Sequence, residues 1–197
     1  MGELILLRHG ETEWSLTGKH TGRTDIPLTP RGEAAAAALA PVLARRDIVA
    51  AFASPAQRAA KTAALAGLAD AKLDPDLWEW DYGGYEGLTT PQIQETRPGW
   101  NLWRDGVIPG DAEHPGETVE QVSERTDRVL ARIAPLLATG DVALIAHGHV
   151  LRVLAARYLC LEPTAGRMFR LDTGTVSTLG TEHAEPVIVS WNVPPLA

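Results

Sequence analysis

Two apolar segments of the chain end in the same way, at a histidine followed by a glycine. One is Leu4-Ile5-Leu6-Leu7-Arg8-His9-Gly10, and the other is Val142-Ala143-Leu144-Ile145-Ala146-His147-Gly148. Neither run alternates with polar residues, so each is typical of a strand that is buried on both faces of a sheet. Ligands of open α/β sheets bind beyond the carboxyl ends of the strands. If the two strands lie parallel in one sheet, we expect both imidazoles to reach the same crevice.

Between these two runs the pattern alternates between helix and strand. An alanine-rich segment that opens at Thr29-Pro30 predicts a helix to about Arg46, and Ile48–Ala53 predicts a short strand. Ser54-Pro55-Ala56-Gln57 predicts the start of the next helix, which should end near Gly67. In this interpretation serine is the N-cap, proline takes the first helical position and glutamine completes a capping box.

A second capping box predicts a long amphipathic helix in the later part of the chain. The box is Thr118 to Gln121, and the apolar side of the helix carries Val122, Val129, Ile133 and Leu137. Gly140-Asp141 then turns the chain into the second His-Gly strand, which a helix over residues 150–159 follows. Residues 175–179 and 187–191 are typical of short strands.

Residues 78–116 interrupt this alternation. They are rich in glycine, proline and tryptophan and have no sustained periodicity apart from a short helix predicted at Pro91–Arg97. Such an insert commonly forms a lid or a pocket wall. Because no repeat or linker divides the chain, we expect a single α/β domain over residues 1–197. Its predicted architecture is a three-layer sandwich with a mostly parallel central sheet and helices on both faces.

The composition is ordinary for a globular protein, with 45% hydrophobic and 22% charged residues among 197. No apolar run approaches the roughly 20 residues of a membrane helix, so we expect neither a leader segment nor a membrane partner. Cys160 is the only cysteine, which excludes an internal disulfide and favours a reducing, cytoplasmic location. The net charge of −7 argues against a nucleic-acid partner and requires that any anion site gather its arginines locally.

Two arginines fall in the first turns of predicted helices. Arg58 lies in the helix after Ser54, and Arg152 lies in the helix after His147. A cation at a helix start opposes the helix dipole unless an anion shares the site. A surface arginine paired with a carboxylate is the simpler interpretation of Arg58, just as a lone strand-end histidine is more often structural. The recurrence of histidine and arginine at these junctions favours a pocket for a dianionic phosphoryl group.

Two interpretations compete for the histidines. Either one imidazole is a nucleophile that accepts a phosphoryl group, or His9, His147 and His149 hold a metal ion. The neighbouring arginines would repel a divalent cation, and the sequence contains no HExxH or aspartate-rich metal motif. We therefore expect phosphoryl chemistry that uses no metal and no other cofactor.

A phosphatase also needs a proton donor for the leaving oxygen. Glu79, Asp81 and Glu86 are the candidates in the tryptophan-rich segment, and spacing alone does not choose among them. Glu79 stands between Trp78 and Trp80, and apolar surroundings would raise the pKa of its carboxyl group. A raised pKa suits an acid that works near neutrality, which favours Glu79.

Several motifs follow one another in a recognisable order along the chain. They are Arg8-His9-Gly10-Glu11-Thr12, then Gly22–Thr29 followed by Gly32, then Ser54-Pro55-x-x-Arg58, then Ala146-His147-Gly148. In this order they resemble the histidine phosphatase superfamily, which includes the cofactor-dependent phosphoglycerate mutases. The resemblance covers most of the chain, and the combination of motifs is highly specific.

The resemblance implies a role for each of five residues. His9 would be the phosphorylated nucleophile, and Glu79 would be the acid and base. Arg8, Arg58 and His147 would form the phosphate pocket, and in the mechanism that we expect His147 is cationic.

Within the superfamily, three further segments resemble the sedoheptulose-1,7-bisphosphatase-like branch. They are Thr12–Ser15, Trp78–Gly87 and Trp103–Gly106. This resemblance implies a small-molecule phosphomonoester, a sugar phosphate or bisphosphate, as the substrate. The implied substrate-binding residues are Thr12, Ser15, His20, Thr21, Gly22, Tyr82, Gly148 and Arg152. Ser15 stands where the family often has asparagine, and His20 stands where the branch has tyrosine.

Two other functions stay open at this point. A phosphoglycerate-type mutase would require a bisphosphorylated primer and would release no free phosphate, although the mutases usually have a longer insert before the second histidine. A catalytically silent phospho-ligand binding module would usually have lost His9, Arg58 or His147, and this chain keeps all three. The sequence does not determine the oligomeric state, so a homo-oligomer also stays open.

Overall fold

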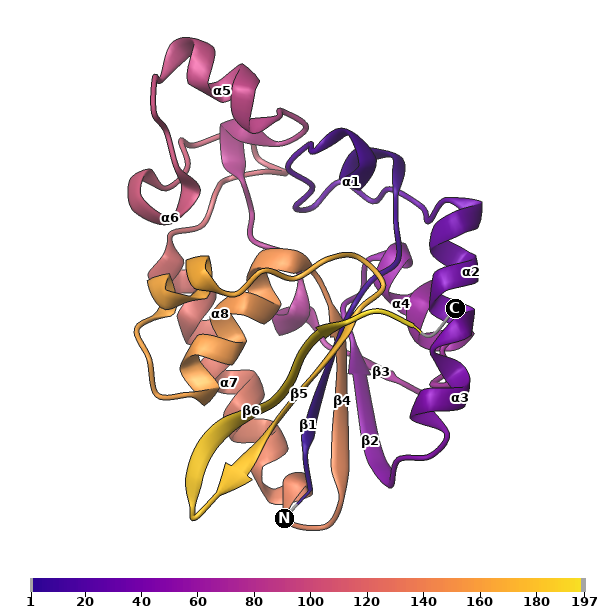
Figure 1. Cartoon of the computed structure of the whole chain (residues 1–197). Helices are drawn as coiled ribbons and strands as arrows, with labels where there is room; N and C mark the ends of the chain where they lie inside the picture. The colour runs from indigo at the N-terminus through magenta and orange to yellow at the C-terminus, as the bar shows by residue number, and fades with distance from the viewer. Residues whose placement is uncertain (1, 196–197) are drawn as a thin grey trace.

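A six-stranded sheet forms the centre of the computed structural model, which describes residues 2–195 (Figure 1). The strand order is β3-β2-β4-β1-β5-β6. The strands are β1 (Leu4–Arg8), β2 (Ile48–Ala53), β3 (Lys72–Leu73), β4 (Asp141–Ala146), β5 (Val176–Glu182) and β6 (Glu185–Val193). The first four run parallel, whereas β5 is antiparallel to β1 and forms a hairpin with β6. The predicted α/β fold with a mostly parallel sheet is confirmed.

The two strands that end in histidine are neighbours in this sheet. Leu4 pairs with Val142, and the register continues to Arg8 opposite Ala146. The backbone N–H of His9 then donates to the carbonyl oxygen of Ala146 at 2.9 Å. Because the strands are parallel and in register, His9 and His147 follow them at the same edge of the sheet, as their sequence pattern predicts.

Helices cover both faces of the sheet and its carboxyl edge. They are α1 (Glu13–Thr17), α2 (Pro30–Ala38), α3 (Ala40–Leu43), α4 (Gln57–Leu65), α5 (Thr90–Thr96), α6 (Leu102–Asp105), α7 (Val119–Leu137) and α8 (Gly148–Tyr158). Short 3₁₀ turns are η1 (Pro75–Leu77), η2 (Gly83–Tyr85) and η3 (Pro163–Met168). In Figure 1, α2, α3 and α4 lie on one face, α7 and α8 lie on the other, and α1, α5 and α6 lie beyond the carboxyl ends of β1 and β4.

Successive side chains of the central strands enter two different cores. Leu4 and Leu6 of β1 belong to the core under α7 and α8, whereas Ile5 and Leu7 belong to the core under α2 and α4. All four are at most 1% exposed, because side chains alternate across a sheet that helices cover on both sides. The apolar runs in the sequence do not alternate with polar residues because both faces of these strands are buried.

Two predicted helix boundaries in the first half of the chain are wrong. The alanine-rich segment is not one helix to Arg46, because it breaks at Leu39 into α2 and α3. Pro41 lacks the N–H that a continuous helix requires, and its ring would clash with the carbonyl of Ala37. Ser54 is not the N-cap of α4, whose cap position is Ala56 with no side-chain hydrogen bond. Arg58 nevertheless lies in the first turn of α4, as predicted.

The later elements follow the sequence pattern closely. α7 begins at its predicted capping box, in which Thr118 and Gln121 bond reciprocally to each other's backbone N–H groups. The short helix predicted in the insert is α5, and the insert also contains α6, which the sequence pattern did not indicate. Among residues 2–195, no helix combines the length and the apolar character that crossing a bilayer requires.

The double burial of the central strands predicts a large stability effect. Leu144 on β4 has no exposed surface, and we expect Leu144→Ala to lower the free energy of unfolding by about 2–5 kcal/mol, because a cavity is left in a packed core. Val189→Ala on β6, where the side chain is 53% exposed, should cost less than about 1 kcal/mol. Urea unfolding measures both variants, and equal losses would contradict the packing described here.

Candidate active site

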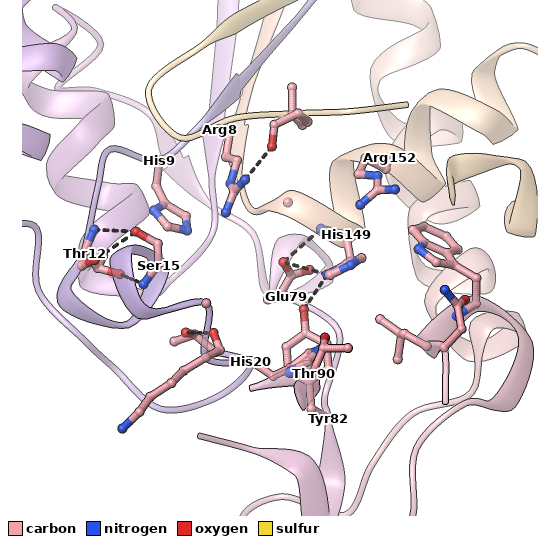
Figure 2. A pocket seen from close by; sticks show the side chains of 18 of the residues that line it. Arg8, His9, Thr12, Ser15, His20, Glu79, Tyr82, Thr90, His149 and Arg152 are labelled. Atoms are coloured by element: carbon pink, nitrogen blue, oxygen red, sulfur yellow. Dashed lines mark hydrogen bonds and ion pairs between the residues drawn. The ribbon is translucent and has the colours of Figure 1, made fainter. Parts of the chain in front are cut away.

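A cavity of about 380 Å³ lies beyond the carboxyl ends of β1 and β4 (Figure 2). Most of the residues expected in the site line it: Arg8, His9, Thr12, Ser15, His20, Thr21, Glu79, Tyr82, Gly148 and Arg152. The insert contributes Trp100 and Trp103 to the lining. Arg58, His147 and Gly22 are not among the lining residues, and Arg58 and His147 are buried.

His9 is held in one tautomer by its own neighbour in the chain. Its Nδ1 lies 2.7 Å from the carbonyl oxygen of Gly10, which can only accept a hydrogen bond. Nδ1 therefore carries the hydrogen, and in the neutral ring Nε2 keeps its lone pair. Burial and the charges of Arg58 and Arg8 lower the pKa of His9 well below 6.5. His9 is thus a neutral imidazole with a free nucleophilic nitrogen.

Arg8 brings a cation to the same end of β1. One of its terminal nitrogens donates to the carbonyl oxygen of Leu171. Its Nε is the one buried side-chain polar atom without a hydrogen-bond partner among residues 2–195. A Cβ atom at Gly148 would lie 3.2 Å from Cζ of Arg8, so glycine at this position leaves room for the guanidinium group. An unpaired buried donor on a cation is costly without an anion to accept from it.

His147 does not carry the positive charge that we expected of it. Its Nδ1 accepts from Nε–H of Arg58 at 3.1 Å, and its Nε2 lies 2.7 Å from Oγ of Ser54. Arginine can only donate, so Nδ1 is the acceptor and Nε2–H donates to the serine. Burial and the charge of Arg58 lower the pKa of His147 well below 6.5. The expectation of a cationic His147 is therefore wrong.

Arg58 turns inward, and one terminal nitrogen also lies 4.0 Å from Oδ1 of Asp25, whose carboxylate accepts from the N–H of Gln57 at the start of α4. The fully buried guanidinium donates to the carbonyl oxygens of Thr21, Gly22 and Thr24 at 3.3, 3.0 and 2.9 Å. These bonds tie the 21–24 loop to α4 and His147. The unfavourable position of Arg58 in a first helical turn is thus compensated by carbonyl oxygens of a loop distant in sequence.

Glu79 lies at the N-terminus of α8. One carboxylate oxygen accepts from the N–H groups of Trp80 and Val150 at 2.9 and 2.8 Å, and the other accepts from His149 N–H at 2.9 Å. The side chain is only 4% exposed, as expected of a buried carboxyl group, and three backbone N–H groups donate to it. The positive end of a helix favours a carboxylate at this position.

The other two candidate carboxylates are occupied elsewhere. Asp81 accepts from the N–H groups of Gly83 and Gly116 at 2.9 and 3.1 Å. Glu86 accepts from the N–H groups of Gly22 and Thr24 at 2.9 to 3.1 Å. Neither lines the cavity, so geometry selects Glu79 where spacing did not.

His149 is a cavity residue whose position the sequence interpretation missed. It lies in the first turn of α8, and its Nδ1 is 2.6 Å from the phenolic oxygen of Tyr82 (Figure 2). Burial raises the pKa of Tyr82 well above 10, and burial with the charge of Arg152 lowers the pKa of His149. Both groups are therefore neutral. The predicted helix began at Val150, so the prediction left His149 outside the helix. A prediction that began the helix at Gly148 would have placed His149 in its first turn.

The remaining predicted contacts line the cavity from three elements. Thr12 and Ser15 form the capping box of α1. His20 bonds Leu88 through Nδ1, which leaves Nε2 free, and its ring packs edge-on against Tyr82 at 4.9 Å between centroids. Arg152 lies 4.8 Å above the ring of Trp103. It is the fifth residue of α8 and not a first-turn residue, because the helix begins at Gly148.

The histidine geometry bears on the metal interpretation as well. Both ring nitrogens of His147 already have protein partners, and Nδ1 of His149 bonds Tyr82. Within residues 2–195, no three histidine, cysteine, aspartate or glutamate side chains form a group suited to a metal ion. Two arginines, Arg8 and Arg152, line the cavity, and arginine is a common partner of phosphoryl oxygens.

Comparisons with known proteins agree with this geometry. A family model described as the histidine phosphatase superfamily (branch 1) matches residues 4–194. The chain is 39% identical over 182 residues to an acid phosphatase of Mycobacterium tuberculosis, which covers 91% of this chain and 87% of the relative. It is 38% identical to a sedoheptulose 1,7-bisphosphatase of Saccharomyces cerevisiae, across 77% of this chain and 65% of that protein. A solved structure of a Mycobacterium tuberculosis open reading frame superposes with a TM-score of 0.92 at 36% identity, covering 99% of each chain.

The neutral buried histidines predict how stability depends on pH. The pKa values of His9 and His147 lie well below 6.5 in the folded chain, so the unfolded chain binds more protons as the pH falls below about 6.5. The free energy of unfolding should therefore be highest above pH 6.5 and decline toward pH 5. Urea unfolding at several pH values measures this decline.

Histidine variants provide the controls for this prediction. His147→Asn should flatten the decline, whereas replacement of the exposed His183 by asparagine should leave it unchanged. A free energy of unfolding that stays constant or rises between pH 7 and pH 5 would contradict the assignment.

Proposed function

The chain belongs to the histidine phosphatase superfamily and is a phosphatase, and from that premise we propose that it hydrolyses a small sugar phosphate or bisphosphate through a phosphohistidine on His9. One observation carries the proposal. The neutral His9, fixed by Gly10 with Nε2 unprotonated, lines the same cavity as Arg8, whose guanidinium group has an unpaired Nε–H. A nucleophile and a donor for phosphoryl oxygens thus share one cavity.

The first step transfers the phosphoryl group. Nε2 of His9 attacks phosphorus as the bond to the leaving oxygen breaks, and Glu79 gives that oxygen a proton. The Nδ1–H bond to Gly10 stabilises the imidazolium charge that develops on the ring. Because its three N–H donors favour the carboxylate, Glu79 receives its proton from a phosphomonoester that binds as the monoanion.

The second step regenerates the enzyme. Glu79, now a carboxylate, takes a proton from water, and the oxygen attacks phosphorus as the P–N bond breaks. Inorganic phosphate leaves with the proton that Glu79 took from water, so Glu79 returns to the carboxylate and His9 returns to the neutral Nδ1–H form. Arg8 neutralises charge on the phosphoryl oxygens in both steps, and Arg58 contributes through its field and by holding His147.

The size and lining of the cavity support a sugar-sized leaving group. The cavity lining also includes His20, Tyr82 and His149, whose polar ring atoms suit hydroxyl groups. Arg152 adds a cation above Trp103 at the same cavity. The similarity to a protein named sedoheptulose 1,7-bisphosphatase agrees with such a substrate.

Trapping of the covalent intermediate tests the proposal. After a rapid alkaline quench with a ³²P-labelled sugar phosphate, the wild type should carry label on a peptide that contains His9. His9→Ala should lose the label and at least about 10³-fold of kcat/KM while it stays folded, because it removes the nucleophile.

A surface histidine is the matched control for this variant. His183→Ala should keep both label and activity, because His183 is exposed and lies outside the cavity. Label on another residue, or activity of His9→Ala close to that of the wild type, would refute the phosphohistidine. Steady release of free phosphate without a primer separates hydrolysis from mutase chemistry.

A further inference from the structure

Arg125 on α7 is a nearly buried cation that does not line the cavity and yet bonds to the segment that carries Glu79. It is 5% exposed, and its NH1 donates to the carbonyl oxygens of Asp76 and Trp78 at 2.8 and 2.5 Å. Its Nε and NH2 donate to the two carboxylate oxygens of Glu117 at 2.9 and 3.0 Å. This paired arrangement fixes both position and orientation of the guanidinium group.

Glu117 continues the connection to the other side of Glu79. Its Oε2 accepts from the N–H of Asp81 at 2.9 Å, and its carbonyl oxygen accepts from Nε1–H of Trp80 at 2.8 Å. The Arg125–Glu117 ion pair therefore holds the backbone at residue 78 and at residue 81. Glu79 stands between these two anchored points, with its carboxylate on the N-terminus of α8.

We propose that the Arg125–Glu117 ion pair, whose side chains are 6% and 15% exposed, is a positioning pair, which fixes the orientation of the Glu79 carboxylate toward the leaving oxygen. The inference rests on the proposed function, because it takes Glu79 as the proton donor. A buried ion pair contributes little net stability, since desolvation offsets the attraction between the charges. Its use here is geometric, because a displacement of about 1 Å at a reacting group can cost about 100-fold in rate.

Arg128 on the same helix provides a matched control. It also bonds to the 76–81 segment, through the side chain of Asp76 at 2.6 Å, but its own side chain is 57% exposed. It contacts neither Glu117 nor the backbone beside Glu79. Exposed ion pairs of this kind are worth little, so Arg128 separates general attachment of the segment from placement of the carboxylate.

The test compares two leaving groups within each variant. A p-nitrophenolate ion leaves without a proton, whereas the alkoxide of an alkyl phosphate such as glycerol 3-phosphate needs one from the general acid. The ratio of kcat/KM for p-nitrophenyl phosphate to kcat/KM for the alkyl phosphate reports proton donation in the first step. This ratio does not depend on the folded fraction of the enzyme, because both substrates are assayed with the same preparation.

We expect Arg125→Met and Glu117→Gln to raise this ratio by about 10- to 100-fold, with most of the loss in kcat for the alkyl phosphate. Arg125→Lys should recover part of the loss, and Arg128→Met should leave the ratio unchanged. Glu117→Gln removes the charge but keeps the shape of the side chain. If Arg125→Met fails to fold, the kcat/KM ratio of Glu117→Gln tests the proposal. An unchanged ratio in Glu117→Gln and Arg125→Lys would overturn the positioning role.

Glu79→Gln separates failure of this inference from failure of the proposed function. If Glu79→Gln raises the ratio and the Arg125 and Glu117 variants do not, the positioning pair is refuted and Glu79 stays the proton donor. If Glu79→Gln leaves the ratio unchanged, the proton donor in the proposed function is wrong, and the positioning pair falls with it.

Discussion

The positive charge buried at the carboxyl edge of the sheet is the constraint around which this site is organised. Arg58 has no exposed surface, and Nε of Arg8 is buried without a partner. Burial, and after it the charges of both cations, lowers the pKa values of His9 and His147, which are therefore neutral. A neutral imidazole is a nucleophile, whereas an imidazolium is not, so the charge that attracts a phosphoryl group also keeps His9 reactive.

Two histidines that lie at equivalent strand ends have different roles in this charged environment. His9 bonds a carbonyl oxygen through Nδ1 and leaves Nε2 free, whereas His147 uses both nitrogens, for Arg58 and Ser54. The first can react with phosphorus, and the second supports the arginine that ties down the 21–24 loop. Two equivalent strand ends thus carry different chemistry because their hydrogen-bond partners differ.

The sequence predicts those parts of the fold that depend on local pattern. The double burial of β1 and β4 follows from their unbroken apolar runs, and the start of α7 follows from its capping box. The convergence of His9 and His147 follows because parallel strands in register must end together. Pro41 also explains why the alanine-rich helix breaks at Leu39, although the alanine-rich composition concealed this break.

The contacts that decide charge and orientation were beyond prediction, because they join segments that are distant in the chain. Arg58 bonds a loop about 35 residues away, and Glu79 reaches backbone N–H groups about 70 residues away. A helix dipole, a buried carbonyl oxygen or an ion pair such as Arg125–Glu117 acts only once the fold has brought its partners together. The residue types identified the candidate site residues, whereas the tautomers, charges and orientations of these residues depend on tertiary contacts.

The protonation state of His9 is the most direct measure of this account. Nitrogen-15 NMR of histidine-labelled protein, with His9→Asn to assign the signals, reports tautomer and pKa together. We expect a neutral Nδ1–H ring that takes up a second proton only well below pH 6.5. An Nε2–H tautomer, or a pKa of His9 at or above 6.5, would contradict it.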